Sequence, residues 1–403
     1  MVRKAFVNRG LLIILLLLGM PQLHAQERSF QQCIADWQQQ GRDRGLSETT
    51  ITRVLPRLKH LPEIIVYDRR QPEFTQTFAQ YLQQRLTPAR IDRGASLFEL
   101  HKDFLAGVEQ QHGVPGRFLV AFWGMETNFG SYLGKMPTLD SLATLACDPR
   151  RSEYFTEELY QALMLMERES LSMSQMHGSW AGAMGHTQFM PSSYRRYAID
   201  GDGDHRIDLW RSKQDALSSA GNFLNRLGWN ANQGWGAEVI LPETFPYAES
   251  GLHNRQPTAY WAQVGVRFAN GEPLTETDVP SAVLLPAGHT GPAFLVFPNF
   301  NVIMRWNNSE SYALAVGLLA DRIAGMRPLL NPPSLSEPAL SKQALWSIQS
   351  RLNELGYDAG KPDGVMGPNT RAALRAFQQA SGLVADGYPD PDTQARLLRT
   401  GSG

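Results

Sequence analysis

Apolar side chains recur at three- to four-residue spacing in the first third of the chain, as at Phe78, Tyr81 and Leu82. This spacing places them on one face of a helix, and prolines interrupt the pattern at intervals. The pattern therefore predicts a helical N-terminal subdomain over about residues 26–112. Helical spacing continues over about residues 113–235, where glycine becomes more frequent.

The pattern changes over about residues 236–299, where short runs rich in Val, Leu and Phe alternate with Pro, Gly and Asn. Such runs are typical of β-strands separated by turns, so we expect a small β insertion here. Helical spacing returns over about residues 300–328, which we assign to the same core as residues 113–235. The predicted fold is therefore mainly α, within the α+β class.

The end of the chain is predicted to form a separate unit. A Pro- and Ser-rich stretch over residues 329–340 indicates an extended linker. Beyond it, over residues 341–399, the apolar positions that would form a small core are Leu345, Ile348, Leu352, Leu355, Ala373, Leu374, Phe377 and Leu397. Three short helices would bury this set, so we expect a three-helix C-terminal domain.

The N-terminus has the pattern of an export signal. Basic residues precede an unbroken apolar run from Leu11 to Leu18, and the small residue Ala25 offers a cleavage point. The run is well short of the roughly 20 residues that span a bilayer. We expect removal of residues 1–25 and a soluble periplasmic protein; a retained membrane anchor is the alternative.

Charge is balanced, with 38 basic and 39 acidic residues interspersed along the chain. This balance argues against a nucleic-acid binder that relies on a broad basic surface, and it favours a neutral or mixed-charge partner. The two cysteines, Cys33 and Cys147, form an even pair in a protein expected to reach an oxidising compartment. A disulfide between them and two buried thiols both fit this pattern.

The most informative segment spans residues 113–130 and predicts a helix. Phe118, Phe122 and Phe129 share one apolar face, and Glu126 lies at the edge of that face. Partial desolvation favours the protonated form of a carboxyl group, which a general acid for a glycosidic oxygen requires. A single Glu near a helix end is more often solvated or paired, so this segment alone does not establish a catalytic role.

A second segment, residues 178–194, combines small residues with the polar side chains of Ser179 and Gln188. Small residues let a bulky ligand approach the backbone, and hydroxyl and amide groups orient it. Tight helix packing around Gly182 and Gly185 is the structural alternative.

Three motifs taken together resemble the membrane-bound lytic murein transglycosylase B family: residues 123–127, residues 178–194 and Trp306-Asn307-Asn308-Ser309. The motifs are long, ordered and correctly separated, and the resemblance covers roughly residues 30–327. It implies a lysozyme-like helical core with helical and β subdomains, in agreement with the pattern above. We therefore expect one catalytic domain over residues 26–328.

The resemblance also implies the site residues, with Glu126 as the catalytic acid and base. The residues expected to line the sugar subsites or to contact the substrate are Ser179, Gln188, Trp306, Asn307, Tyr312, Arg150 and Arg151. The two arginines would bind peptide carboxylates or sugar, although surface arginines in a helix-capping loop are the alternative. The chain departs from the family at Trp306, where Tyr is usual, and at Phe223, where at least some relatives have Tyr; stacking would survive there, but a hydroxyl hydrogen bond would not.

A single carboxylate suffices for the chemistry of this family, whereas hydrolytic glycosidases generally use two. We find no second carboxylate inside the matching motifs. Glu126 would protonate the oxygen between N-acetylmuramic acid and N-acetylglucosamine and then accept the proton of the muramoyl C6 hydroxyl. Attack by that hydroxyl closes a 1,6-anhydro ring without water and without a cofactor. A hydrolytic muramidase and an inactive wall-binding scaffold are the alternatives.

One loop has the spacing of calcium ligands in an EF-hand. The residues at its first, third, fifth, seventh and ninth positions are Asp200, Asp202, Asp204, Arg206 and Asp208. The loop departs from the standard pattern at His205, where Gly is usual, and at Arg211, where Glu is usual; Asp215 could supply the last carboxylate. A structural calcium site and an Asx-rich turn without an ion both fit these residues.

Residues 341–399 resemble the peptidoglycan-binding domain of many wall enzymes, on Asp363-Gly364, Gly367-Pro368 and residues 376–378. The implied role is to hold the enzyme on its polymer and raise its local concentration, although these motif residues are also turn formers. The expected partners are glycan strands of peptidoglycan, together with proteins of cell-wall synthesis or division. The chain itself is expected to be a monomer.

Overall fold

The computed structural model describes residues 29–69, 76–336 and 338–400, so the expected export segment, residues 1–25, lies outside the described ranges. Within these ranges most of the secondary structure is helical, and no helix is long and apolar enough to cross a membrane. Strands are short and concentrated between residues 236 and 296. The predicted mainly α fold with a small β insertion is confirmed.

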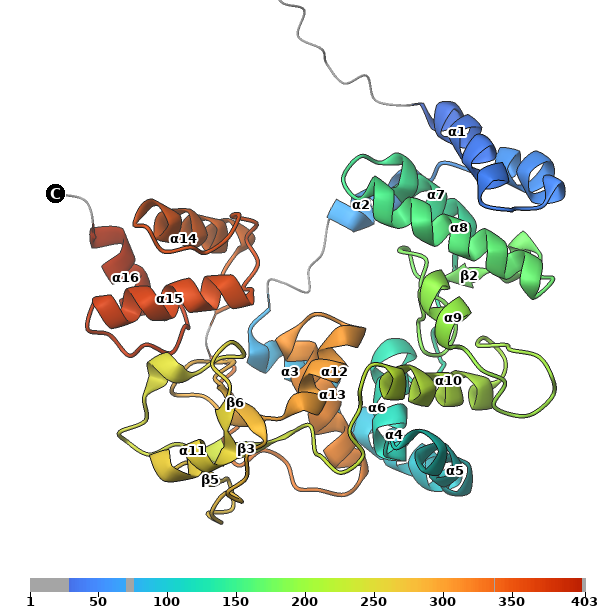
Figure 1. Cartoon of the computed structure of the whole chain (residues 1–403). Helices are drawn as coiled ribbons and strands as arrows, with labels where there is room; N and C mark the ends of the chain where they lie inside the picture. Colours follow the sequence, from blue (N-terminus) through green and yellow to red (C-terminus); the bar gives the residue numbers. More distant parts are fainter. Residues whose placement is uncertain (1–28, 70–75, 337, 401–403) are drawn as a thin grey trace, which may run out of the picture.

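The N-terminal helices pack with helices from the middle of the chain, as Figure 1 shows for α1 and α2 beside α7 and α8. The elements of this group are α1 (Phe30–Asp43), η1 (Thr50–Val54), η2 (Leu55–Arg57), α2 (Pro62–Arg69), α7 (Thr138–Cys147), α8 (Ser152–Arg168), η4 (Met173–Gln175) and α9 (Pro191–Tyr197). They share one hydrophobic core, the outer core, in which Ile51, Leu142 and Leu163 are fully buried. A disulfide between Cys33 and Cys147 joins α1 to the end of α7.

A second core, the central core, surrounds α6 (Gly116–Thr127). The helices packed around it are α3 (Phe78–Arg85), α4 (Pro88–Leu100), α5 (Lys102–His112), α10 (Lys213–Arg226), α12 (Pro298–Trp306) and α13 (Glu310–Ile323). Every residue from Phe118 to Met125 is buried, as expected of a helix with neighbours on all sides.

The described part of the expected N-terminal subdomain of residues 26–112 is divided between these two cores. Its first half joins the outer core, whereas α3, α4 and α5 join the central core. Apolar periodicity identifies the face of a helix that will be buried, but it does not identify the element that covers that face.

Local sequence signals set the ends of the helices that position the site. Thr77 caps α3 with a capping box, and Thr87 caps α4 immediately before Pro88. Helix α6 follows Pro115 and ends at Asn128, whose φ of 49° lies in the left-handed region. Asn tolerates this conformation better than most residues, so the chain turns sharply just after α6.

The β insertion is a five-stranded antiparallel sheet in the order β4-β6-β7-β3-β5. Its strands are β3 (Gly236–Ile240), β4 (Gln256–Pro257), β5 (Arg267–Phe268), β6 (Pro280–Leu284) and β7 (Ala293–Val296), with η5 (Tyr247–Glu249) and α11 (Thr258–Val264) between them. Alternate side chains point to opposite faces. On β7, Phe294 and Val296 therefore join the central core, whereas Ala293 and Leu295 pack with Trp261 of α11.

Two short strands, β1 (Met136–Pro137) and β2 (His177–Gly178), pair in antiparallel fashion apart from this sheet. They tie the segment that follows α6 to the start of residues 178–194. This pairing brings the chain that follows residues 123–127 beside the start of residues 178–194.

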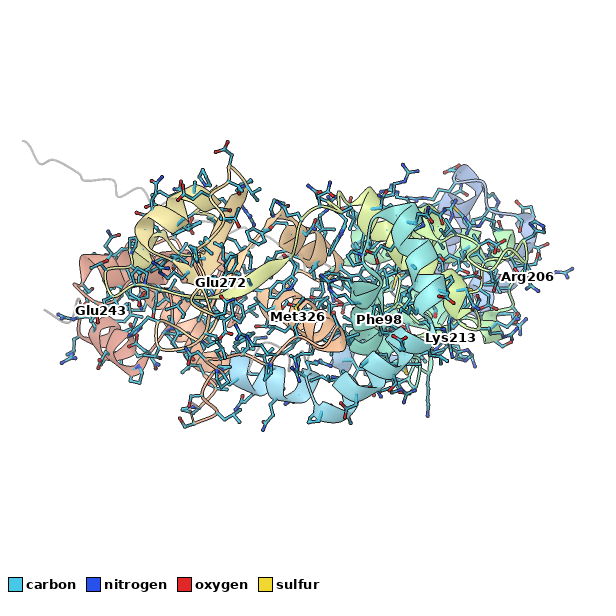
Figure 2. The ribbon with its side chains drawn as sticks, turned by 90° about the horizontal axis from the view of Figure 1, so that it is seen from below. Phe98, Arg206, Lys213, Glu243, Glu272 and Met326 are labelled. Carbon is cyan, nitrogen blue, oxygen red and sulfur yellow. A yellow bond between two sulfur atoms is a disulfide. The ribbon has the colours of Figure 1, made fainter. Side chains whose placement is uncertain are left out.

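Three helices form the C-terminal domain: α14 (Lys342–Glu354), α15 (Pro368–Ala380) and α16 (Pro391–Arg399). The buried amide of Gln349 donates to Asp363 and Thr370, and that of Gln378 donates in the same way to Asp386 and Thr393. Figure 2 shows Glu243, near this domain, and Arg206 at opposite ends of the molecule.

Candidate active site

Glu126 lies in the last turn of α6, where the helix emerges from the central core. The side chains before it, from Phe118 to Met125, are buried, and Glu126 itself is half-buried. The left-handed residue Asn128 ends the helix two residues later. A carboxyl group in this position is held by a rigid helix and still reaches the surface, as a general acid must.

Tyr312 provides a direct partner for this carboxyl group. Its hydroxyl donates a hydrogen bond to Glu126 Oε1, across 186 positions of sequence. Tyr312 is buried in the first turns of α13, which Ser309 caps by accepting from the Tyr312 backbone N at 3.3 Å. Burial first, and then the neighbouring Glu126 charge, raise the pKa of Tyr312 well above its usual value, so the phenol stays a proton donor.

Trp306 lies in an aromatic cluster that joins three parts of the site. Its ring stacks on Phe122 of α6 with 4.2 Å between centroids, and Phe223 of α10 meets it edge-on at 5.1 Å. Phe189, from the second motif, lies 5.4 Å from it. Trp306 and Phe223, where the resemblance implied a lost hydroxyl, are thus in direct ring contact with each other.

Residues 178–190 of the second motif form a compact loop, and residues 191–194 are the start of α9. Ser179 closes its turn, since its hydroxyl accepts from the Ala183 backbone N at 3.1 Å. Gln188 has a φ of 49°, and its Nε2 donates to the carbonyl oxygens of Gly185 and Leu133. The Gln188 bonds fasten the motif to the loop that follows α6, and its Oε1 takes part in neither of them.

Sequence reasoning missed a buried network that joins His186 to two neighbours of Glu126 on α6. The indole of Trp123 donates to His186 Nδ1 at 3.1 Å, and the Thr127 hydroxyl donates to the His186 carbonyl oxygen at 2.9 Å. Burial first, and then the Lys213 charge, lower the pKa of His186 to about 4, so the imidazole is neutral at neutral pH. A single His between Gly185 and Thr187 carries no sequence signal of such a role.

Asn307 is exposed at the end of α12, and it lies five residues before Tyr312. The expected site residues Glu126, Ser179, Gln188, Trp306, Asn307 and Tyr312 thus come from α6, the 178–190 loop and the α12–α13 turn. The contacts above link these three segments to one another.

Arg150 and Arg151 have an intramolecular partner. Both guanidinium groups bind the Asp68 carboxylate, which is only 3% exposed, and Arg150 also donates to the Asp68 carbonyl oxygen. This contact ties α2 to the loop between α7 and α8. A substrate role for the pair stays a prediction, and the half-exposed Arg150 side chain is compatible with it.

The acidic loop brings three of its predicted ligands together. Carboxylate oxygens of Asp200, Asp202 and Asp204 lie within 4.8 Å of one another, and such hard oxygen donors suit calcium. Asp215, in contrast, accepts hydrogen bonds from the backbone N atoms of Gly201 and Asp208. The two carboxylate oxygens of Asp215 therefore hold the loop against α10.

Two family models match the chain. The transglycosylase SLT domain matches residues 29–321, and the putative peptidoglycan binding domain matches residues 342–397. Membrane-bound lytic murein transglycosylase B of Escherichia coli (strain K12) is 35% identical over 246 residues, which are 61% of this chain and 67% of that protein.

Solved structures give the same result. SltB3 from Pseudomonas aeruginosa, in complex with NAG-anhNAM-pentapeptide, is 42% identical with a TM-score of 0.87, covering 92% of this chain and 100% of that one. Escherichia coli Slt35, in complex with calcium, is 30% identical with a TM-score of 0.62, covering 74% and 94%. The chain therefore belongs to the SLT-domain family of lytic murein transglycosylases, which are peptidoglycan-cleaving lyases.

Proposed function

We propose that this protein cleaves the β-1,4 bond between N-acetylmuramic acid and N-acetylglucosamine in peptidoglycan and leaves 1,6-anhydromuramoyl ends. The observation that carries the proposal is the half-buried Glu126 carboxyl group, bound by the Tyr312 hydroxyl where three family motifs meet. An anhydromuramoyl sugar, such as the one in the SltB3 complex, is the end that such a ring closure produces.

The reaction uses Glu126 twice. Its protonated carboxyl first gives a proton to the glycosidic oxygen, so the bond from that oxygen to the muramoyl C1 breaks and N-acetylglucosamine leaves as the alcohol. The Glu126 carboxylate then takes the proton of the muramoyl C6 hydroxyl, whose oxygen bonds to C1. The proton given in the first step is thereby recovered, and no water is consumed.

Tyr312 holds the carboxylate in place through both steps, because its hydroxyl remains a donor whichever way the proton moves. Ser179, Gln188, Trp306 and Asn307 are proposed to bind the sugars on either side of the scissile bond. Arg150 and Arg151 are proposed to bind carboxylates of the peptide stem through the guanidinium surface that Asp68 leaves exposed.

The loop from Asp200 to Asp208 is proposed to bind a calcium ion through Asp200, Asp202 and Asp204, with Arg206 contributing its carbonyl oxygen. The ion would offset the mutual repulsion of these carboxylates and so stabilise the loop. Figure 2 places Arg206 at the end of the molecule far from the C-terminal domain.

We also propose export to the periplasm, on the basis of the N-terminal pattern, and action there as a monomer. Association with proteins of wall synthesis or division would recruit the enzyme to sites of growth.

Glu126→Gln tests the reaction, because glutamine keeps the size and hydrogen bonding of the side chain but cannot exchange a proton at neutral pH. We expect release of muropeptides from purified sacculi to fall by at least about 1,000-fold, while binding to sacculi is retained. Mass spectrometry of the wild-type products distinguishes the alternatives. Anhydro ends support the proposal, reducing ends indicate a hydrolase, and the absence of soluble product indicates a scaffold.

A further inference from the structure

The C-terminal domain lies against the catalytic domain through specific contacts. Asp386, whose side chain is 1% exposed, accepts a hydrogen bond from the His289 backbone N at 2.9 Å and lies 2.7 Å from His289 Nδ1. His289 belongs to the turn between β6 and β7 of the β insertion. A buried carboxylate that binds two groups of the other domain indicates a formed interface rather than a loose tether.

Close backbone approach and the linker reinforce this interface. A Cβ atom on Gly288 would lie 3.1 Å from the Tyr388 side chain, and its φ of 74° already favours glycine. The Glu238 carboxylate of β3 accepts hydrogen bonds from the backbone N atoms of Leu330 and Asn331 at 2.9 and 2.8 Å. The linker is thereby fixed to the β insertion before the C-terminal domain begins.

Helix α15 presents Arg371 to the start of α13. Arg371 Nε lies 3.7 Å from Glu310 Oε2, and its Nη2 donates to the Pro286 carbonyl oxygen at 3.5 Å. The two charged side chains are each 16% exposed, so solvent screens their attraction less than at an open surface. The C-terminal domain therefore contacts the central core at a helix end.

This helix end is part of the candidate active site. Glu310 is the first residue of α13, and Tyr312 follows two positions later in the same turn. The Tyr312 hydroxyl donates to Glu126, and Asn307 lies just before the turn. A displacement of Glu310 would therefore move the backbone that carries Tyr312.

We propose that Arg371 is a positioning residue for the reaction: by holding Glu310, it fixes the first turn of α13 and keeps the Tyr312 hydroxyl on the Glu126 carboxylate. The C-terminal domain is then a structural part of the catalytic unit as well as a wall anchor. This inference rests on the proposed function, since it assigns Arg371 to the reaction of Glu126.

A double-mutant cycle between Arg371→Ala and Tyr312→Phe in the full chain tests this role. Arg371→Ala alone is expected to lower kcat about tenfold and to change KM for soluble glycan strands by less than about twofold, because positioning is disturbed and binding is not. In the Tyr312→Phe background, Arg371→Ala is expected to change kcat by less than about twofold, because the hydroxyl it positions is gone. Equal losses of kcat in both backgrounds would overturn the proposal.

Two further variants keep the test decisive. Arg396→Ala removes an exposed arginine from α16 of the same domain, outside the contact with Glu310, and is expected to leave kcat for soluble glycan strands unchanged. If Arg371→Ala does not fold, Glu310→Gln removes the same ion pair from the other side. It is expected to show the same loss of kcat in the wild-type background and the same absence of a further loss in the Tyr312→Phe background. A loss of sacculus binding with unchanged kcat would assign Arg371 to wall binding instead and overturn the positioning role.

The same assay separates the two proposals. If the wild-type protein releases no anhydro-ended products, the proposed function fails. If those products appear but the cycle with Tyr312→Phe is additive, only the role of Arg371 fails.

Discussion

At the scale of single residues, the Tyr312 hydroxyl determines how the Glu126 carboxylate is held. The phenol ring also packs in the central core, with 6.4 Å between its centroid and that of Phe122. The Tyr312 side chain thus both packs in the core and donates a hydrogen bond, and a substitution that removes only the hydroxyl separates these two contributions.

Tyr312→Phe keeps the packed ring and removes the donor to Glu126 Oε1. A hydrogen bond to a charged group contributes about 1.5–3 kcal/mol, so we expect kcat to fall by about 10- to 100-fold with little change in KM. Rates of anhydromuropeptide release measure this effect. Tyr160→Phe is the control, because its hydroxyl donates to the Trp37 carbonyl oxygen in the outer core and lies outside the site. Equal kcat values for Tyr312→Phe and wild type would contradict a role for the bond in catalysis.

At the scale of elements, the loop before α10 is organised by its own carboxylates. Asp200 accepts hydrogen bonds from the backbone N atoms of Gly203 and His205, and Asp215 holds the loop from α10. This arrangement brings the carboxylates of Asp200, Asp202 and Asp204 together, and a bound cation would reduce the repulsion between them.

Calcium is therefore expected to raise the thermal unfolding temperature by several degrees, and chelation is expected to reverse the shift. At a calcium concentration one hundred times the dissociation constant, the stabilisation is about 2.7 kcal/mol. Calorimetry with calcium or a chelator measures it. Asp202→Asn should abolish the shift, and Asp392→Asn, an exposed carboxylate of α16, should leave it intact. Identical melting curves in calcium and chelator would rule out the site.

At the scale of the whole molecule, the domains are joined by specific contacts between buried or half-buried polar side chains. Asp321 of α13 accepts a hydrogen bond from Trp235 Nε1 at 2.9 Å, and Arg117 of α6 lies 4.0 Å away. Trp235 leads into β3 and packs over Gly317, where a Cβ atom would come within 2.3 Å of the indole. This junction joins the central core to the β insertion, as Arg371 joins the core to the C-terminal domain.

Asp321 gives the first junction a dependence on pH. Burial raises its pKa to about 6, against the smaller effects of the Trp235 hydrogen bond and the Arg117 charge. The folded state therefore holds more protons than the unfolded state between about pH 4 and 6. The stability that Asp321 contributes is full below about pH 4 and is lost as pH rises through 6.

Asp321→Asn keeps an acceptor for Trp235 and cannot ionise. We expect its free energy of unfolding, relative to wild type, to increase between pH 4 and pH 7. Urea unfolding at the two pH values measures the change, with the exposed Asp278→Asn as control. A difference from wild type that stays constant with pH would contradict the raised pKa of Asp321.

The sequence alone determined the elements and the identity of the catalytic candidate. The apolar face that contains Phe118 and Phe122, and the short β-rich runs of residues 236–299, are patterns of a few residues, so they can be interpreted locally. The mainly α fold and the β insertion followed from such local patterns, whereas the family and its reaction followed from the resemblance of three motifs to known proteins; these predictions are confirmed.

Only the tertiary structure decided which elements face one another. It divided the described helices before residue 113 between two cores, joined His186 to Trp123 of α6, and bound Arg150 and Arg151 to Asp68. The Tyr312 bond to Glu126 spans 186 residues, and the Arg371 contact with Glu310 crosses two domains. Contacts of this kind depend on the packing of whole surfaces, because distant segments meet only after their helices and sheets have formed.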